Sequence, residues 1–259
     1  IKNIPGAKDL AAKGELLFGT IDTFLIWKLT EGKSHVTDIT NASRTMLFNI
    51  IQEEWDQDLL DLFEVPSNML PKVHENVSDF GVTNILGGEI TIGGVAGDQQ
   101  AALIGQCCFS PGDIKSTYGT GCFMIVNTGE EILYSQNKLL TTIGYKINGK
   151  TTFALEGSIF VAGSAIQWLR DGLHFFEDSS ETEILAKQAS EGSRVLVIPA
   201  LTGLGAPYWD AEARGAIFGL TRDTSKEDII KGTLESIAFQ SKDLVEAMKK
   251  DNATFEKLM

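Results

Sequence analysis

The sequence predicts an α/β fold. Stretches in which apolar and polar residues alternate, as in strands, take turns along the chain with stretches whose apolar residues recur every three or four positions, as in helices. The composition is that of a folded globular protein, because 43% of the 259 residues are hydrophobic and 22% are charged. At roughly 100 to 200 residues per domain, this length allows one large domain or two small ones.

Elements expected in the first third can be placed from their boundary residues. A helix opens at residues 20–23 and ends at Gly32, and a strand follows at residues 35–40. Residues 55–65 have the apolar spacing of a helix, which the proline at the next position stops. The segment 67–88 is expected to be mostly loop.

The middle of the chain gives a clearer pattern of strand, glycine turn, acid and helix. Residues 90–97 are expected to form a buried strand and residues 98–106 a helix. Two short strands, 113–118 and 122–127, then form a hairpin whose turn, residues 119–121, contains two glycines and can take positive φ.

The last part continues the alternation. A strand at residues 151–155 leads into a helix at about 161–173, and a strand at 194–199 precedes a glycine-rich loop at 202–206. A long helix closes the chain, announced by Thr224 and Glu227 in the spacing of a capping box. Its predicted inner face consists of Ile230, Leu234, Ile237, Ser241, Leu244 and Met248.

Charge and cysteine content restrict partners and compartment. The 22 Lys and Arg against 35 Asp and Glu give a net charge of −13, and so acidic a surface repels nucleic acid and anionic lipid headgroups. No run approaches the roughly 18 apolar residues that cross a bilayer. We therefore expect no nucleic acid and no membrane as partner. Three cysteines, two of them adjacent, form no paired framework, which favours a reducing compartment, the cytoplasm.

Asp98 is the first candidate for chemistry. It follows a predicted strand and a glycine, which is where ligands bind in open α/β sheets. It could act as a general base if a bound alcohol lies within hydrogen-bond reach. It could also be the N-cap of the helix that follows. Both interpretations can hold together.

Two glycine-containing segments are further candidates. Gly119, Thr120 and Gly121 offer backbone N–H groups and a hydroxyl for an anion, although an ordinary hairpin turn has the same composition. Gly163 and Gln167 lie four apart on one helical face, where they could form a shelf for a nucleotide or simply allow close packing. The three histidines have no partner at metal-ligand spacing, so we expect no metal site formed by protein side chains.

Several segments occur together in a fixed order. They are residues 19–23, 40–49, 97–103 (GDQQAAL), 117–123 (TYGTGCF) and 202–221, which begins TGLGAPYWD and ends RGAIFGLT. Together they resemble the FGGY carbohydrate kinase family, and within it the members that phosphorylate glycerol. The resemblance extends over nearly the whole chain.

The resemblance implies two actin-like (ribonuclease H-like) domains with a cleft between them, residues 1–106 belonging to the glycerol side and 107–259 to the ATP side. It implies ATP-dependent phosphorylation of glycerol to sn-glycerol 3-phosphate, with ATP and Mg²⁺ as cofactors, in a homodimer or homotetramer. Asp98 would take the proton from the glycerol 3-hydroxyl, Gln99 would hydrogen-bond glycerol, and Phe123 would form part of the apolar wall behind the carbon chain. The residues implied to bind ATP are Gly119, Thr120 and Gly121 at the terminal phosphates, and Gly163 and Gln167 along the nucleotide channel.

The chain departs from the family pattern at both ends. Family members begin with a phosphate- and magnesium-binding segment of the type Asp-Gln-Gly-Thr-Thr, which has no counterpart here. We therefore expect the chain to be the central part of a longer enzyme and to lack kinase activity by itself. Two alternatives stay open: a kinase of the same family acting on a pentulose or related sugar, and a non-catalytic actin-like nucleotide-binding module. The retained Asp98 speaks against the second.

Overall fold

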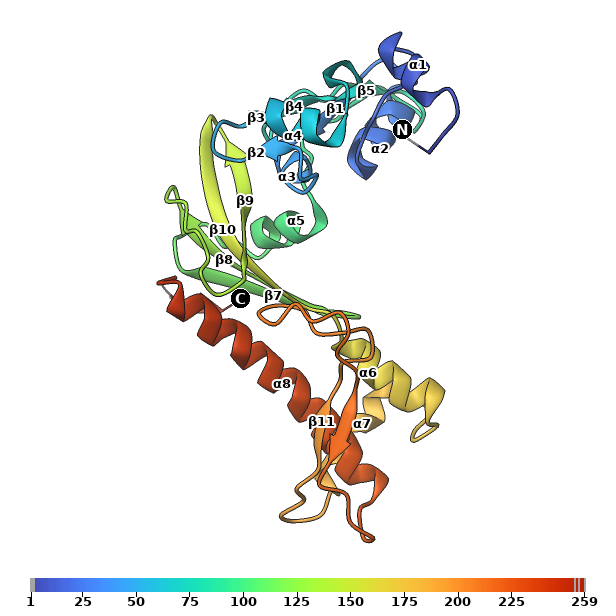
Figure 1. Ribbon diagram of the computed structural model, residues 1–259, viewed down its shortest axis with the longest axis vertical. Coiled ribbons are helices and arrows are strands. Elements are labelled where there is room, and N and C mark those ends of the chain that lie inside the picture. The colour runs from blue at the N-terminus through green and yellow to red at the C-terminus, as the bar shows by residue number, and fades with distance from the viewer. Residues whose placement is uncertain (1–2, 254, 256, 259) are drawn as a thin grey trace. The chain divides into compact units, whose positions relative to one another are not determined.

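The computed structural model describes residues 3–253, 255 and 257–258, which form two compact units (Figure 1). The first unit holds the chain up to Phe109 together with residues 127–132 and 142–154. The second holds residues 110–126, residues 133–141 and the chain from Leu155 onward. The chain thus passes between the units several times, and the division into residues 1–106 and 107–259 stays a prediction about the domains of the intact protein.

The first unit is built from short elements. Its helices are α1 (Ala7–Ala12), α2 (Ile21–Leu29), α3 (Ile39–Ala42), α4 (Gln57–Phe63), the single 3-10 turn η1 (Ser67–Met69) and α5 (Asp98–Gly105). Its own strands are β1 (Val36–Asp38), β2 (Phe48–Asn49), β3 (Glu54–Trp55), β4 (Lys72–His74), β5 (Val82–Thr83) and β6 (Ile90–Thr91). They pair two by two, β1 with β4 in parallel and the other two pairs antiparallel. The helices predicted at 20–32, 55–65 and 98–106 are confirmed as α2, α4 and α5.

The strand predicted at residues 35–40 is shorter than expected, because α3 begins where it should continue. The Asp38 carboxylate accepts the backbone N–H groups of Thr40 (2.7 Å) and Asn41 (3.3 Å) and so caps α3. A capping side chain offers the backbone ahead of it an alternative to sheet pairing. The segment 35–40 therefore ends in a helix, although it is rich in β-branched residues.

One other expectation for the first unit is wrong. The predicted buried strand 90–97 is reduced to β6, whose two residues are exposed. The segment 67–88 is mostly loop, as predicted, and η1, β4 and β5 are its short regular elements. Strands of two or three residues are too short for a detectable alternation. β6 ends at Thr91, and Gly93 and Gly94 follow after one residue, in keeping with the depletion of glycine from strands.

The second unit contains most of a five-stranded sheet with the order β13-β7-β8-β10-β9. Its strands are β7 (Asp113–Tyr118), β8 (Cys122–Gly129), β9 (Leu140–Ile147), β10 (Lys150–Ile159) and β13 (Lys257–Leu258), of which β8, β9 and β10 also contribute residues to the first unit. The predicted hairpin is confirmed, with Thr117 of β7 opposite Phe123 of β8. The strand predicted at 151–155 is longer than expected, and β9 was missed.

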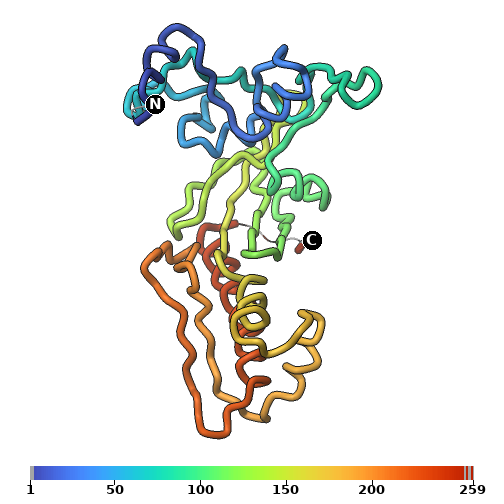
Figure 2. Tube along the Cα trace, turned by 90° about the vertical axis from the view of Figure 1, so that its right-hand side faces the viewer, coloured from blue at the N-terminus to red at the C-terminus, as the bar shows by residue number. Residues whose placement is uncertain are grey.

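The remaining elements of the second unit follow the sheet. They are α6 (Gly163–Gln167), the π-helical turn η2 (Trp168–Gly172), the 3-10 turn η3 (Ser179–Glu181), α7 (Thr182–Lys187), β11 (Leu196–Ile198), β12 (Ala216–Phe218) and α8 (Lys226–Lys250). The helix predicted at 161–173 is thus α6 continued by η2. Strand β11 pairs with β12 and packs along α8 (Figures 1 and 2).

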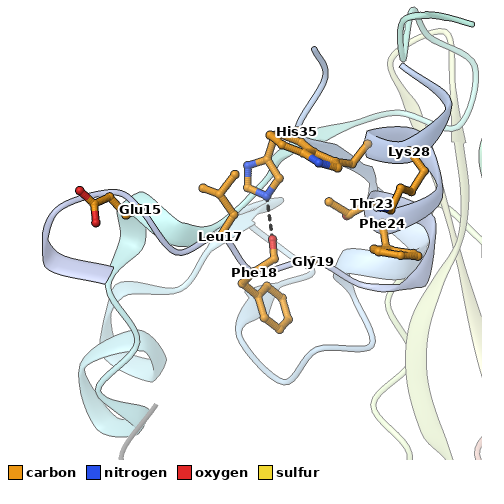
Figure 3. Close-up of a pocket in the computed structure, with 9 residues that line it drawn as sticks. Glu15, Leu17, Phe18, Gly19, Thr23, Phe24, Lys28 and His35 are labelled. Carbon is orange, nitrogen blue, oxygen red and sulfur yellow. Dashed lines mark hydrogen bonds between the residues drawn. The ribbon is translucent and has the colours of Figure 1, made fainter. Parts of the chain in front are cut away.

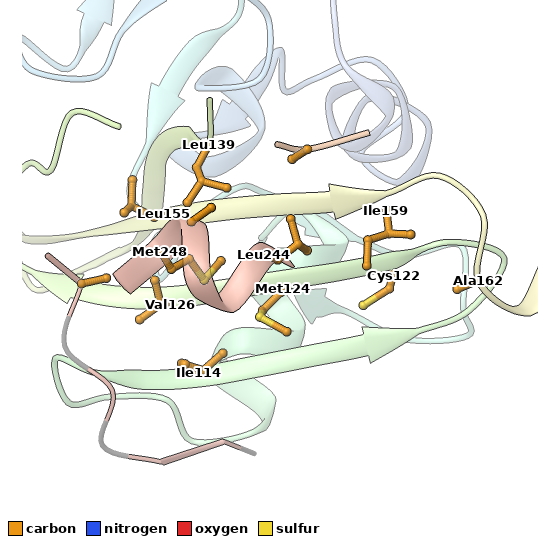
Figure 4. Packing of buried hydrophobic residues seen from close by; sticks show 13 residues of the cluster. Ile114, Cys122, Met124, Val126, Leu139, Leu155, Ile159, Ala162, Leu244 and Met248 are labelled. Atoms are coloured by element: carbon orange, nitrogen blue, oxygen red, sulfur yellow. The ribbon is translucent and has the colours of Figure 1, made fainter. Parts of the chain in front are cut away.

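The long helix α8 covers one face of the sheet with the stripe that its sequence predicts. Leu244 and Met248 are fully buried against Met124 and Val126 of β8 and Leu155 of β10 (Figure 4). The capping box lies one residue later than predicted: Ser225 is the N-cap, and its partner is Asp228. Thr224 instead accepts the N–H of Thr221 (2.8 Å), in the turn before the helix.

Candidate active site

Asp98 is the first residue of α5, and its side chain is exposed. The N-cap is Gly97, with φ −59° and ψ 149°, so the interpretation of Asp98 as the N-cap is wrong. One carboxylate oxygen accepts a hydrogen bond from the side-chain amide of Gln99 (3.0 Å). A carboxylate in the first turn interacts favourably with the helix dipole. The structure therefore presents Asp98 outward at the beginning of the helix.

Gly97 is closely packed where α5 begins. A Cβ atom at this position would lie 2.7 Å from the Oε1 atom of Gln100, closer than packed atoms allow. The Gly97 carbonyl accepts the N–H of Ala101 (2.7 Å), while its own N–H donates to the Thr40 hydroxyl (2.9 Å). The turn before Asp98 is thus tied to the segment that begins α3.

The two adjacent glutamines have different positions. Gln100 is buried, and its amide donates to the Ile143 carbonyl (3.4 Å), which together with the fully buried Leu103 anchors α5. Gln99 is half-buried and lies beside the Asp98 carboxylate. The helical period therefore assigns one glutamine to the protein interior and leaves the other next to the candidate base.

The glycine hairpin between β7 and β8 is held by backbone groups. The N–H of Gly119 donates to the Gly121 carbonyl (2.8 Å). The carbonyls of Gly119 and Thr120 accept N–H groups of Gly163 (2.9 Å) and Ser164 (3.0 Å) at the beginning of α6. Gly119, Gly121 and Gly163, the three glycines predicted to bind ATP, therefore lie together. Gly119 and Thr120 are exposed.

The turn does not use the positive φ that its glycines allow, since neither Gly119 nor Gly121 has it. Close packing is the reason for two of the glycines. A Cβ atom on Gly121 would lie 2.3 Å from the Ile159 carbonyl oxygen, and one on Gly163 would lie 2.5 Å from the Gly119 carbonyl oxygen. Backbone carbonyls cannot move away as a flexible side chain can, so a larger residue would displace the turn.

The last two predicted residues also belong to the second unit. Gln167 ends α6 one turn after Gly163 and is exposed. Phe123 is half-buried on β8, and its carbonyl accepts a hydrogen bond from the buried ammonium of Lys115 (3.4 Å). The structure thus assigns Asp98 and Gln99 to the first unit and the other predicted residues to the second.

A cavity of about 470 Å³ in the first unit contains none of the predicted site residues. It lies between the chain segment before α2 and α2 itself, and its lining includes Glu15, Phe24 and Lys28 (Figure 3). The His35 ring nitrogen Nε2 forms a hydrogen bond with the Phe18 carbonyl (2.7 Å) at its edge (Figure 3). Gly19 and Thr23 of its lining belong to the segment 19–23 that resembles the family, but no sequence pattern predicted a cavity there.

The described part of the chain has no evident metal site. No group of three or more His, Cys, Asp or Glu side chains there could hold a metal ion. None of the helices in that part is long and apolar enough to cross a membrane.

Comparison with known proteins decides the family. Residues 2–105 match the N-terminal domain of the FGGY family of carbohydrate kinases, and residues 114–259 match its C-terminal domain. The chain belongs to the FGGY family. Its fold is accordingly the actin-like fold of FGGY kinases, as the resemblance implied.

Three similar proteins place this FGGY chain more closely. A protein of Enterococcus casseliflavus called glycerol kinase is 61% identical over 97% of the chain and 50% of its own length. One of Marinomonas sp. (strain MWYL1) with the same name is 59% identical over the whole chain and 53% of its own length. The solved Plasmodium falciparum glycerol kinase with ADP superimposes with a TM-score of 0.89 at 39% identity, covering the whole chain and 52% of that protein. The chain thus spans about half the length of the relatives it matches.

Proposed function

We propose that the whole protein transfers the terminal phosphate of ATP to glycerol and forms sn-glycerol 3-phosphate. The observation that carries the proposal is the exposed Asp98 carboxylate at the first position of α5, in a chain similar along its whole length to proteins called glycerol kinase. Because the chain spans about half of those relatives, we expect the isolated chain to lack this activity.

Asp98 is the proposed general base. Proton transfer requires a heavy-atom distance of about 2.6–3.2 Å between base and hydroxyl. The exposed carboxylate can approach a bound alcohol in this way. Gln99, whose amide already lies 3.0 Å from that carboxylate, is the proposed hydrogen-bond partner of glycerol. Phe123 is proposed to supply apolar contact to the carbon chain.

The glycine hairpin and α6 are the proposed ATP-binding elements. Gly119, Thr120 and Gly121 would lie at the terminal phosphates, where the exposed backbone of the first two residues allows close approach. Gly163 and Gln167 would line the channel of the nucleotide. The tight contact between Gly163 and the hairpin supports this grouping, because it fixes the beginning of α6 against the turn.

Mg²⁺ is the proposed companion of ATP. It is usually bound by one or two carboxylates together with substrate phosphates, and when bound it neutralises the charge of the transferred group. The described residues offer no cluster of three metal-ligating side chains. We therefore propose that the ion enters with the nucleotide and assign no residue of this chain as its ligand.

Location and assembly are part of the same proposal. The three cysteines are free thiols, which supports a reducing cytoplasm. The net charge of −13 supports the proposal that neither nucleic acid nor a membrane is a partner. A homodimer or homotetramer is proposed from the family resemblance, and light scattering of the full-length protein tests it.

The experiment that tests the function uses the purified full-length protein with MgATP. Transfer to glycerol and to xylulose is compared by coupled ADP release, and the glycerol product is identified by a dehydrogenase specific for glycerol 3-phosphate. We expect kcat/KM to be higher for glycerol. Faster transfer to xylulose would favour the pentulose alternative, and binding of MgATP without transfer to any polyol would favour the non-catalytic module.

A further inference from the structure

The turn that presents Asp98 is fastened to a buried polar cluster, here called the Asp38 cluster and consisting of Asp38, Thr40 and Asn76. All three side chains are buried, with 0%, 0% and 3% of their surface exposed. They come from the end of β1, from α3 and from the segment after β4. All of them belong to the first unit, as Asp98 does.

Asp38 is the acceptor at the centre of this cluster. Its carboxylate accepts hydrogen bonds from the Thr40 hydroxyl, the Thr40 N–H (2.7 Å), the Asn41 side-chain amide (2.6 Å) and the Asn76 side-chain amide (2.8 Å). Burial raises the pKa of the Asp38 carboxyl, and these hydrogen bonds act in the opposite direction. Capping α3 uses only the backbone N–H groups of Thr40 and Asn41, and the Thr40 and Asn76 side chains donate to the buried carboxylate in addition.

The Thr40 hydroxyl connects Asp38 to the turn. A hydroxyl has one proton and two lone pairs. The Gly97 N–H can only donate, so the hydroxyl accepts from it at 2.9 Å and gives its own proton to Asp38. The hydroxyl thus accepts from Gly97 and donates to Asp38, so the position of the Gly97 N–H depends on that of the Asp38 carboxylate.

Asn76 holds the other end of the same turn. Its side-chain amide donates both to Asp38 and to the Val95 carbonyl (2.9 Å), and its backbone carbonyl accepts the Val95 N–H (3.0 Å). Its side-chain oxygen accepts the N–H of Lys146 on β9 (2.7 Å). The three residues before Asp98 are therefore held by hydrogen bonds from buried groups, at Val95 and at Gly97.

We propose that Thr40, anchored by Asp38 and Asn76, is a positioning residue that sets the place of the Asp98 carboxylate during phosphoryl transfer. This inference rests on the proposed function of Asp98. Its physical basis is that a misplacement of about 1 Å at a reacting group can lower the rate about 100-fold. The alternative is that this buried network stabilises the fold and has no specific effect on catalysis.

The test compares Thr40→Val with Thr40→Ser and Thr30→Val in the full-length protein. Thr40→Val keeps the shape and removes the hydroxyl, whereas Thr40→Ser keeps the hydroxyl. Thr30 is the matched control: it is 2% exposed, its hydroxyl donates to the Ile26 carbonyl (2.8 Å) and accepts the Ser34 N–H (3.2 Å), and it also belongs to the first unit. Its hydrogen bonds do not involve the turn before Asp98.

The expected result separates positioning from stability. Thr40→Val lowers kcat for glycerol about 100-fold with little change in KM for ATP, Thr40→Ser restores kcat to within about tenfold of the original, and Thr30→Val leaves kcat within about twofold. Hydrogen exchange at the Gly97 amide becomes faster in Thr40→Val and stays unchanged in Thr30→Val. If Thr40→Val does not fold, Thr40→Ala gives the same comparison with a smaller side chain.

Two outcomes overturn the inference. One is a kcat of Thr40→Val, or of Thr40→Ala, equal to that of Thr30→Val. The other is an equal loss in Thr40→Val and Thr40→Ser, which would mean that any change of packing at this position lowers kcat and that the hydroxyl has no specific role. Failure of the proposed function is distinguishable, because then the unmodified protein transfers no phosphate to glycerol, while the exchange result at Gly97 still reports on the hydrogen bond.

Discussion

The two halves of the proposed site are held in place by different means. The turn before Asp98 is held by side chains, through the hydroxyl of Thr40 and the amide of Asn76. The glycine hairpin is held by backbone hydrogen bonds to the beginning of α6 and by contacts too close for any Cβ atom. The first half should therefore respond to the loss of a polar group, and the second to the addition of a single carbon.

This difference fits the chemistry that each half is proposed to perform. A base must lie at a defined distance from one hydroxyl, and a buried polar network sets such a position sharply. A phosphate-binding turn must let a ligand approach the backbone, which small residues permit.

Gly121→Ala should give the largest effect in the second half. Its Cβ atom would lie 2.3 Å from the Ile159 carbonyl, and overpacking of this kind destabilises by about 1–3 kcal/mol. Urea unfolding of the variant measures the loss, and KM for ATP should rise with it. Gly119→Ala is the matched control for stability, because no atom lies within 4 Å of its Cβ position. Equal stability of the two variants would contradict the packing argument.

The acid stability of α8 should depend on Asp228. The backbone N–H groups of Ser225 and Ser190 donate to its buried carboxylate and lower its pKa from 3.8 to about 2. Because the folded-state pKa is lowered, this stabilisation is present above about pH 4 and is lost as the pH falls toward 2. The difference in thermal midpoint between the original protein and Asp228→Asn should therefore shrink over that range.

Glu227→Gln controls for the loss of a negative charge at the same helix end. Its difference from the original protein should change less between pH 5 and pH 2 than that of Asp228→Asn. A pH-independent difference for Asp228→Asn would show that the capping box does not hold the carboxylate in its ionised form. The hydrogen bonds of the Asp228 carboxylate would then stabilise the beginning of α8 less than their geometry indicates.

Ser164→Ala should have the smallest effect. The exposed Ser164 hydroxyl donates to the Thr120 carbonyl (2.9 Å), but backbone N–H groups of Ala162 and Ser164 already donate to that carbonyl. Exposed substitutions of this kind change stability by less than about 0.5 kcal/mol. KM for ATP, measured with the full-length protein, should stay within about threefold. A tenfold rise would mean that a side chain, and not the backbone, positions the hairpin.

The sequence predicted the long and strongly patterned parts of the fold. The α8 stripe, the β7–β8 hairpin and the helix beginning at Asp98 follow from periodicity over six or more residues. It did not predict β4, β5 or the early end of β1, because two or three residues give no period and because the Asp38 cap competes with sheet pairing. The capping box was placed one residue too early, since Thr224 and Ser225 can both cap a helix and the sequence does not decide between them.

The candidate site could be predicted in its residue types but not in its supports. Asp98 and the hairpin glycines were recognisable because they occur in motifs. Thr40 was visible only as part of a segment resembling the family, and Asn76 not at all. Their hydrogen bonds to the turn before Asp98 span 57 and 19 positions of chain, which no local pattern records. Gly121 was expected from its freedom to take positive φ, whereas the structure requires a glycine there because the backbone leaves no space for a Cβ atom.

The base role of Asp98 is tested most directly by kcat of Asp98→Asn in the full-length protein with saturating glycerol and MgATP. The amide keeps the shape of the side chain and cannot take the proton, so kcat should fall by about 10² to 10⁴-fold, the usual contribution of general-base catalysis. Binding of MgATP, measured by calorimetry, should persist in the variant. Turnover close to that of the original protein would contradict the assignment of Asp98 as the base.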